Sequence, residues 1–325
     1  MSDSRLILAL DFGGTKLSAA LLGDGEQEWR DLRRTYSPPD AGADYDLGMM
    51  WSMAEDLFVL EGHRPAAVGV SFGGPVDHAS GTVRLSHHVP GWEDMPLGRM
   101  LRESFAAPVA VDNDANVAAY GEYRFGAGRG FEHLLYVTVS TGVGGGWILN
   151  GKPWRGAEGM AGEIGHTVVD PHGPLCLCGN HGCVERLASG PYMAADARRI
   201  LEQNPERGAV LSKLAGGKLQ AIDGRLLSEA ASAGDPLAQE ILDRGAWALG
   251  TGIGNAANLV NPQRVVLGGG VTKAGERWWQ RVRETAAAVT MPEAHVEIVP
   301  AQLGDDAPLW GAVALAQDLL DGFQA

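Results

Sequence analysis

The three cysteines of the chain lie close together in one glycine-containing stretch, CLCGNHGCVE, at Cys176, Cys178 and Cys183. Thiolate sulfur is a preferred zinc ligand, and C-x-C-x4-C spacing resembles a metal clip more than a disulfide framework. A closed tetrahedral zinc site needs a fourth ligand, and three histidines lie nearby in the sequence, at His166, His172 and His181. The spacing predicts zinc over three unligated thiols, but it does not choose among these histidines.

Two glycine turns have the composition of phosphate-binding loops: DFGGTK at residues 11–16 and STGVG at residues 140–144. Glycines let backbone N–H groups approach an anion, threonine and lysine add donors, and Asp11 is placed to hold Mg²⁺ through water. No G-x-x-x-x-G-K-[ST] stretch is present, and no G-x-G-x-x-G follows a strand. Each turn alone is more often an ordinary hairpin, but two matched turns favour nucleotide phosphates. The residues expected to bind them are Asp11, Gly13, Gly14, Thr15, Lys16, Thr141, Gly142 and Gly144.

Apolar runs that end in glycines must position these turns. The stretch RLILALDFGGTKLSAALL predicts two strands, Leu6–Leu10 and Leu17–Leu22, joined by a glycine turn. HLLYVTVSTGVGGGWIL has the same shape, with its turn predicted at residues 141–146, and AAVGVSFGGPV and RVVLGGGV repeat the theme. The likeness of the first and third segments predicts two halves built on one plan.

Helical stretches alternate with these strands, which predicts an α/β fold. One helix is expected to begin at Asn113 or Asp114, directly after the strand PVAVD. A second stops before Pro262, and a final one spans DAPLWGAVALAQDLLDG. We expect a smaller N-terminal domain of residues 1–112 with a returning C-terminal helix in 303–325, and a larger domain of residues 113–302 that carries the cysteines.

Composition excludes several classes of protein. The 325-residue chain has a formal net charge of −14, which argues against binding to nucleic acid. The N-terminal stretch MSDSRLILALDFGGT lacks a basic region and a small-residue cleavage site, so no signal peptide is predicted. Because no apolar run is long enough to span a bilayer, no membrane partner is expected. These observations predict a cytoplasmic protein.

The ordered set DFGGTK, VDNDAN, STGVGGG, GEIGH, CLCGNHGCVE and VVLGGGV covers essentially the whole chain. It resembles the ROK family of bacterial sugar kinases and sugar-responsive repressors, within the sugar kinase and actin-like ATPase superfamily. The stretch AAYGEYRFGAG is most similar to ROK glucokinases. The resemblance implies an α/β fold of two actin-like (ribonuclease H-like) domains with an active-site cleft between them, and ATP with Mg²⁺ as cofactors.

The resemblance also implies roles for individual residues. On the residues alone Asp114 is more simply a helix cap, but its place in VDNDAN matches the family's catalytic base. The implied sugar contacts are Gly73, Gly74, Asn113, Asp114, Glu163, His166 and Glu185, and the implied contacts to adenosine are Gly268 and Gly269. The family's structural zinc implies His166, Cys176, Cys178 and Cys183 as the ligands, which leaves His172 and His181 as bystanders.

The expected activity is therefore transfer of the ATP γ-phosphate to a hexose, most plainly glucose. The alternatives are a ROK kinase for N-acetylmannosamine, N-acetylglucosamine, mannose or fructose, polyphosphate as donor, and a sugar-sensing regulator without a DNA-binding domain. A repressor needs a helix-turn-helix before the first glycine turn, and the first strand begins by about Leu6. An actin-like filament ATPase has no use for the sugar-contact residues. A homodimer or homotetramer is expected from the family.

Overall fold

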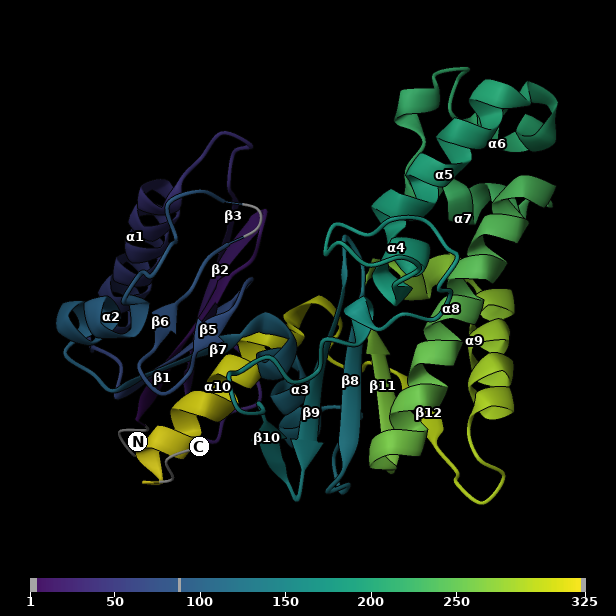
Figure 1. The fold of residues 1–325 in the computed structure, drawn as a ribbon. Helices are drawn as coiled ribbons and strands as arrows, with labels where there is room; N and C mark the ends of the chain where they lie inside the picture. The colour runs from purple at the N-terminus through teal and green to yellow at the C-terminus, as the bar shows by residue number, and fades with distance from the viewer. Residues whose placement is uncertain (1–4, 87–88, 323–325) are drawn as a thin grey trace. The chain divides into compact units, whose positions relative to one another are not determined.

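The computed structural model describes residues 5–86 and 89–322 (Figure 1). The chain divides into two compact units. Unit 1 comprises the residues up to Glu132, the segment Gly146–Ala161 and the residues from Gln302 onward. Unit 2 comprises His133–Gly145 and Gly162–Ala301. Among the described residues, no helix is both long and apolar enough to cross a membrane.

Unit 1 is built on a five-stranded sheet of order β3-β2-β1-β4-β7. Its strands are β1 (Leu6–Phe12), β2 (Lys16–Gly23), β3 (Asp31–Tyr36), β4 (Ala67–Phe72) and β7 (Val109–Asn113). Strand β1 pairs antiparallel with β2 and parallel with β4, and β4 pairs parallel with β7. The register places Asp11 opposite Ser71 and Phe72 opposite Asn113, so the carboxyl ends of β1, β4 and β7 meet at one edge.

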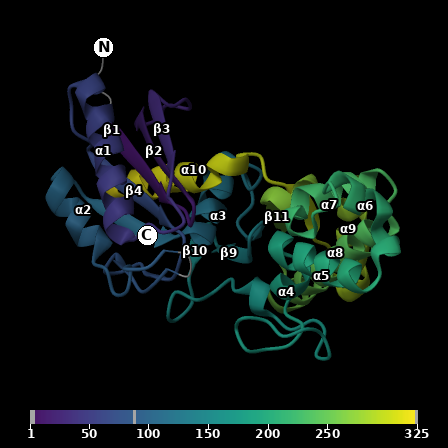
Figure 2. The same ribbon diagram turned by 90° about the horizontal axis from the view of Figure 1, so that it is seen from above.

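Unit 1 also contains two short strands, β5 (Val76–Asp77) and β6 (Thr82–Val83), and four α-helices. The helices are α1 (Ala43–Glu61), α2 (Leu97–Phe105), α3 (Asp114–Phe125) and α10 (Ala307–Leu320). Helix α10, yellow in Figures 1 and 2, packs against α3, β4 and β1. The approach is close, because a Cβ built on Gly69 would lie 1.7 Å from the Ala312 carbonyl oxygen, and one on Gly311 would lie 1.7 Å from that of Val117.

Unit 1 has two glycine turns, one at Gly13–Gly14 after β1 and one at Gly73–Gly74 after β4, and aromatic side chains fill the core next to both. Trp92 is 1% exposed and packs edge-on against Phe12 and Phe72, with ring centroids 5.5 and 4.7 Å apart. Phe12 precedes Gly13, and Phe72 precedes Gly73. The same buried cluster therefore supports both turns from below.

The second sheet has the order β10-β9-β8-β11-β12. Its strands are β8 (Leu134–Val139), β9 (Val143–Leu149), β10 (Lys152–Trp154), β11 (Arg264–Gly268) and β12 (Glu297–Pro300). Strand β11 pairs parallel with β8 and β12, and β10 pairs antiparallel with β9. The strand order repeats that of the first sheet, which confirms the predicted plan of two like halves. The boundary between the units falls within β9, after Gly145.

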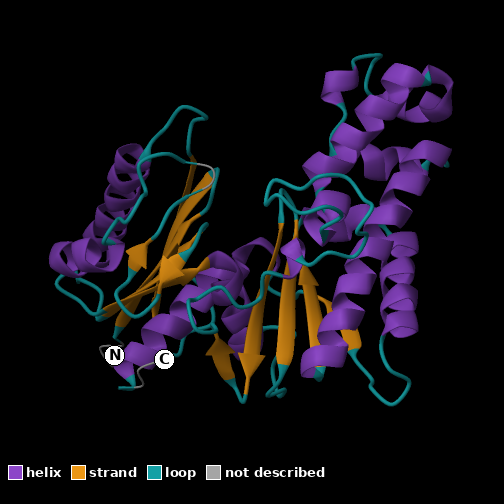
Figure 3. Cartoon of the chain, in the orientation of Figure 1, coloured by secondary structure: helices purple, strands orange, loops and turns teal. Residues whose placement is uncertain are grey.

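Helices of unit 2 flank β8, β11 and β12. They are α4 (Val184–Ala188), α5 (Gly190–Gln203), α6 (Ala209–Leu214), α7 (Gly224–Ser232), α8 (Pro236–Val260) and α9 (Glu276–Val289). The described chain also has five short 3₁₀ turns, at Ile164–His166, Pro205–Gly208, Leu219–Ala221, Gly270–Ala274 and Gly304–Asp306. Asp235 caps α8, and the helix ends at Val260 with Asn261 as its C-cap residue, before Pro262, as predicted. Figure 3 shows that the segment between His166 and Val184, which carries the cysteines, is almost entirely loop.

Two details differ from the sequence-based expectation. The contacts group α3 and residues 146–161 with unit 1, whereas the predicted division assigned them to the second domain. For α3 the reason is that it packs along α10. In addition, the turn after β8 is shorter than predicted, since β9 already begins at Val143. Gly146 lies in that strand, and the position requires glycine because a Cβ there would come within 2.6 Å of the Ala115 carbonyl oxygen of α3. Part of the glycine run therefore serves packing.

Candidate functional site

The two glycine turns of unit 1 are tied to each other through the backbone. The N–H of Gly13 donates to the Lys16 carbonyl at 3.0 Å, which closes the turn between β1 and β2. The N–H of Gly73 donates to the Phe12 carbonyl at 2.8 Å. A Cβ on Gly73 would lie 3.4 Å from the backbone nitrogen of Gly14, so the close approach favours glycine. Gly13, Gly14, Thr15, Lys16, Gly73 and Gly74 thus form one surface at the sheet edge.

Asp11 lies at this edge, 6% exposed. Its Oδ1 accepts a hydrogen bond from the Ser71 hydroxyl at 2.8 Å. Burial raises the pKa of Asp11 to about 6, although the Ser71 hydroxyl and Lys16 both oppose the shift. A buried carboxylate next to a glycine turn suits Mg²⁺, which takes one or two carboxylates together with phosphate oxygens and water. The residues present therefore fit the predicted role of Asp11.

The raised pKa of Asp11 predicts a stability effect with a defined pH dependence. The folded chain binds this proton more tightly than the unfolded chain, so ionised Asp11 destabilises the fold above pH 6. We expect Asp11→Asn to raise the free energy of unfolding by about 2–3 kcal/mol at pH 8, the equivalent of its pKa shift. Denaturant unfolding followed between pH 4 and pH 8 measures the effect.

The gain should shrink as the pH falls from 6 towards 4 and vanish only below the ordinary Asp pKa of 3.8, where wild-type Asp11 is protonated in both states. Asp56→Asn, the same change at an exposed position on α1, serves as the control and should have little effect. A variant that is less stable at pH 8, or a gain that is as large at pH 4 as at pH 8, would contradict the assignment.

Asn113 and Asp114 divide the two roles that the sequence left open. Asn113 is the N-cap of α3, because its side-chain oxygen accepts from the backbone N–H groups of Ala115 and Asn116. Its amide nitrogen donates to the Gly74 carbonyl at 3.1 Å and to Oδ1 of Asp114 at 3.0 Å. Asp114 is the first residue of α3, half-buried, and its Oδ1 also accepts from the Ala115 N–H at 2.8 Å. Since Asn113 performs the capping, Asp114 stands at the positive end of the helix dipole, where a negatively charged side chain is favourable.

In unit 2, Glu185 contacts the second glycine turn. Its Oε2 accepts from the Val143 N–H at 2.9 Å, and a Cβ on Gly142 would lie 2.7 Å from the same oxygen. The N–H of Gly190, the first residue of α5, donates to the Ser140 carbonyl at 2.9 Å. The turn is therefore anchored on both sides by the chain that follows the cysteines.

A cavity of about 1070 Å³ opens next to this turn, within unit 2. Ser140, Thr141 and Gly190 line it at one end, and Gly270 and Lys273 lie in its wall after β11. The remaining lining comes mainly from α5 and α7, with apolar and polar side chains that include Met193, Ala194, Arg198, Ile222, Ser228 and Glu229. The volume and mixed lining suit a ligand with a flat apolar part and charged groups. Gly268 and Gly269, predicted on the adenosine side, precede Gly270 in the same loop.

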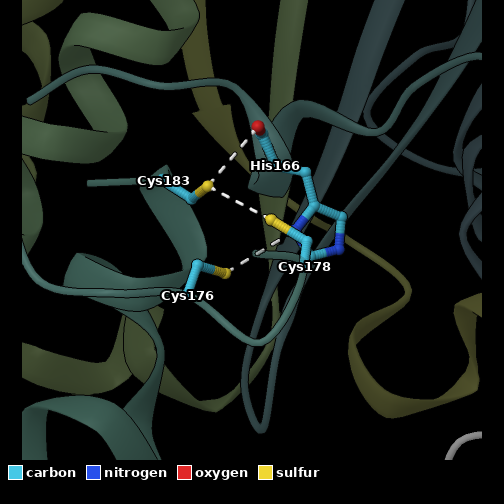
Figure 4. A group of neighbouring side chains, drawn as sticks. All are labelled: His166, Cys176, Cys178 and Cys183. Atoms are coloured by element: carbon cyan, nitrogen blue, oxygen red, sulfur yellow. Dashed lines mark hydrogen bonds between the residues drawn. The ribbon is translucent and has the colours of Figure 1, made fainter. Parts of the chain in front are cut away.

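The four predicted zinc ligands converge in unit 2 (Figure 4). The Sγ atoms of Cys178 and Cys183 lie 3.5 Å apart, and the Sγ of Cys176 lies 3.9 Å from Nδ1 of His166. All four donor atoms lie within 4.8 Å of one another. A tetrahedron with zinc–sulfur bonds of ~2.3 Å has edges of about 3.8 Å, so this donor set fits zinc.

The surroundings of the thiols agree with a metal site. Burial raises the pKa of Cys176 and Cys183, whereas a hydrogen bond with the Asn180 backbone lowers the pKa of Cys178. A bound cation replaces the protons of such thiols, so its affinity rises with pH. The other two nearby histidines lie outside the cluster: His172 is exposed, and Nδ1 of His181 lies 3.0 Å from the Gly173 carbonyl oxygen.

The predicted site residues thus form two groups, one within each unit. Unit 1 brings together the glycine turns, Asp11, Asn113 and Asp114, and unit 2 brings together Thr141, Gly142, Glu185 and the metal ligands. Glu163 is exposed at the start of the 3₁₀ turn that carries His166. The prediction that one sugar contacts both groups in a shared cleft stays a prediction.

Sequence reasoning missed two features of these groups. Ser71, the partner of Asp11, lies in a fully buried apolar strand and gave no signal of its own. Gly190 lies at the start of α5, where it lines the cavity. The dipeptide Gly190–Pro191 marks a helix beginning with proline in its first turn, and this signal could have located it.

The chain resembles sugar kinases along nearly its full length. The sequence pattern of the ROK family matches residues 7–319. A glucokinase from Thermotoga maritima is 33% identical over 321 residues, which cover 97% of this chain and 98% of the relative. An N-acetylmannosamine kinase from Shigella boydii is 35% identical over 310 residues, 95% of this chain and 98% of that protein.

Solved structures show the same likeness. A ROK family glucokinase from Streptomyces griseus, in complex with glucose and AMPPNP, superposes with a TM-score of 0.82 at 36% identity. The match covers 96% of this chain and 99% of that chain. The predicted α/β fold of two actin-like halves is confirmed by this likeness together with the repeated strand order of the two sheets.

Proposed function

Because the chain belongs to the ROK family, we propose that it is an ATP-dependent hexose kinase whose acceptor is glucose. The observation that carries the proposal is the pair Asn113–Asp114 at the start of α3. A phosphotransferase needs a carboxylate within hydrogen-bond reach of the attacking hydroxyl. Asn113 supplies the cap and leaves Asp114 at the helix N-terminus for that role.

Asp114 acts as the general base. Its carboxylate accepts the proton of the sugar hydroxyl as the oxygen attacks the γ-phosphorus and the bond from that phosphorus to the bridging oxygen breaks, which releases ADP. The dipole of α3 favours a negative charge at this position. Asn113, anchored on the Gly74 carbonyl, keeps Asp114 oriented through the bond from its amide to Oδ1. Gly73, Gly74, Glu163, His166 and Glu185 are assigned to the sugar by the family resemblance.

The nucleotide is assigned to the glycine turns and to the cavity of unit 2. The apolar wall that includes Met193 and Ile222 suits the adenine ring, and the turn at Ser140 and Thr141 offers a hydroxyl and backbone groups to phosphate. Asp11, with Lys16 nearby, is assigned to the γ-phosphate side. Mg²⁺, when bound, neutralises phosphate charge, and Asp11 is the residue placed to hold it.

The zinc site has a structural role in this proposal. Four protein ligands leave no open coordination position, so the ion does not activate water. Cys183 is the N-cap residue of α4, and Glu185 lies in the first turn of that helix. Glu185 accepts a hydrogen bond from Val143 in the phosphate turn, so zinc held by the four ligands would fix both the loop and this contact.

Acceptor and donor are tested together with the purified protein. In a coupled assay with ATP and Mg²⁺, we expect kcat/KM for glucose to exceed that for N-acetylmannosamine, N-acetylglucosamine, mannose and fructose by about tenfold or more, the range that single pocket contacts give. Polyphosphate replaces ATP in a parallel series. The control is Asp114→Asn purified in the same way, because any activity that remains in it measures the contribution of a contaminating kinase.

A preference for N-acetylmannosamine would move the proposal to the second candidate, which the likeness to N-acetylmannosamine kinases supports. Turnover with polyphosphate but not ATP would overturn the assigned donor. Absence of transfer to every hexose would refute kinase activity and leave the sugar-sensing regulator. The cytoplasmic location, the homodimer or homotetramer and the lack of a nucleic-acid or membrane partner stay predictions.

A further inference from the structure

Arg155 reaches the end of strand β7 within unit 1, next to the residues assigned to catalysis. Its Nε donates to Oδ2 of Asp112 at 2.6 Å. The side chains are 15% and 3% exposed, so the ion pair is nearly buried. Among the residues that the structure describes, Nη2 of Arg155 is buried and has no hydrogen-bond partner. The guanidinium is therefore placed for Asp112 and not for a wider network of side chains.

Asp112 connects this arginine to the start of α3. Its second oxygen, Oδ1, accepts from the backbone N–H of Asn113 at 2.8 Å and from the Asn116 amide at 3.3 Å. Asn113 in turn donates to Oδ1 of Asp114. Nδ1 of His78 also lies 3.7 Å from Oδ2 of Asp112. A continuous path of contacts thus runs from Arg155 through Asp112 and Asn113 to Asp114.

The backbone of Arg155 holds a second element. Its carbonyl accepts from the Ala161 N–H at 3.0 Å, which closes the loop of residues 155–161. Gly156 and Gly159 in this loop have positive φ, and a Cβ on Gly159 would lie 3.1 Å from the Val76 carbonyl oxygen. Two residues after the loop comes Glu163, which the family resemblance assigns to the sugar. Arg155 therefore anchors both the turn that precedes Asp114 and the loop that precedes Glu163.

We propose that Arg155 is a positioning residue for phosphoryl transfer, and that it acts through Asp112 and not on the sugar. The inference rests on the proposed hexose kinase function. Oriented by Arg155, the Asp112 carboxylate fixes the Asn113 backbone, and Asn113 fixes the base. Loss of the arginine leaves the buried Asp112 carboxylate without its guanidinium partner, and the turn that carries Asp114 shifts to solvate it. Misplacement of a reacting group by about 1 Å costs on the order of 100-fold in rate.

The test compares kcat and KM in Arg155→Met, Arg155→Lys, Asp112→Asn and the double variant Asp112→Asn/Arg155→Met. We expect Arg155→Met to lower kcat by about 100-fold while KM for glucose stays within about threefold, because binding contacts remain. Arg155→Lys should have a kcat at least about tenfold higher than that of Arg155→Met, because lysine keeps the charge. It should stay below the wild type, because lysine lacks the planar guanidinium. The control is Arg64→Met, which removes an exposed arginine paired with Glu55 in the same unit and should leave kcat unchanged.

The double variant separates a path through Asp112 from a direct contact. If Arg155 acts through Asp112, kcat of the double variant equals that of Asp112→Asn, since the two changes interrupt one path. A double variant slower by the product of the single losses overturns the inference, as does Arg155→Met with wild-type kcat or with a loss confined to KM. The double variant retains no unpaired buried carboxylate, so it keeps the test available if Arg155→Met does not fold.

Two measurements distinguish failure of this inference from failure of the proposed function. Wild-type protein without hexose kinase activity refutes the function. Active wild-type protein with a fully active Arg155→Met variant refutes only the role of Arg155. The thermal unfolding midpoint and zinc content of each variant show whether the chain is folded.

Discussion

Asp114→Asn should abolish phosphoryl transfer while the protein keeps its fold and still binds glucose. Asparagine preserves the shape of the side chain and an oxygen for the Ala115 N–H, but it cannot accept the proton of the sugar hydroxyl. Loss of a general base lowers kcat by about 10²–10⁴-fold. Steady-state kinetics measure turnover, and calorimetry with glucose measures binding.

The matched control is Asp44→Asn. Asp44 is an exposed acid in the first turn of α1, so this variant makes the same chemical change at a helix N-terminus without a proposed substrate. It should keep wild-type kcat. If Asp114→Asn retains turnover within about tenfold of wild type, Asp114 contributes only to the helix terminus, and another group takes the proton.

Removing one ligand from the cysteine cluster should also lower activity strongly, although less than loss of the base. We expect about one zinc ion per chain in wild-type protein and nearly none in Cys183→Ser. The variant lacks one of the four donors, the Cys183 sulfur, which lies 3.5 Å from the Cys178 sulfur. The loop and the start of α4 then loosen, Glu185 leaves the Val143 N–H, and kcat/KM for glucose falls by about 10–100-fold or more. Metal analysis and kinetics on the same preparation measure both effects.

X-ray absorption of the wild-type protein should show three sulfur ligands near ~2.3 Å and one nitrogen near ~2.0 Å. His172→Ala is the control, because His172 is exposed and lies outside the cluster, and its zinc content should not change. Metal-free protein with full activity, or a shell of oxygen and nitrogen alone, is incompatible with the site.

Local sequence patterns predicted the strands, the repeat and the helix ends. Strand β1 and its glycine turn follow from apolar residues and punctuation that lie next to each other in the chain. The limits of α8 follow from Asp235, Pro236 and Pro262, which act within one turn of the helix ends. The zinc donors could be named because ligand type and spacing are local, although the choice of His166 came from the family resemblance.

Contacts between distant segments could not be predicted in this way. Asp112 and Arg155 are 43 positions apart, and nothing in either neighbourhood indicates the pairing. Glu122 is fully buried, yet its carboxylate accepts from three backbone N–H groups, at Ala127, Gln302 and Leu303. Tertiary packing creates both environments, so the sequence shows only an ordinary charged residue in each place.

Helix α10 has a consequence for how the protein is made. The helix leaves the ribosome after all of unit 2, yet it covers β1 and β4 at the centre of the first sheet, where its backbone comes as close as Gly69 permits. Domains synthesised first usually fold first, because their segments are complete early. Here the first sheet of unit 1 cannot be covered by α10 until all of unit 2 has been translated. Nascent chains that stop before Ala307 therefore expose that sheet face, and they are the species expected to recruit chaperones or to aggregate.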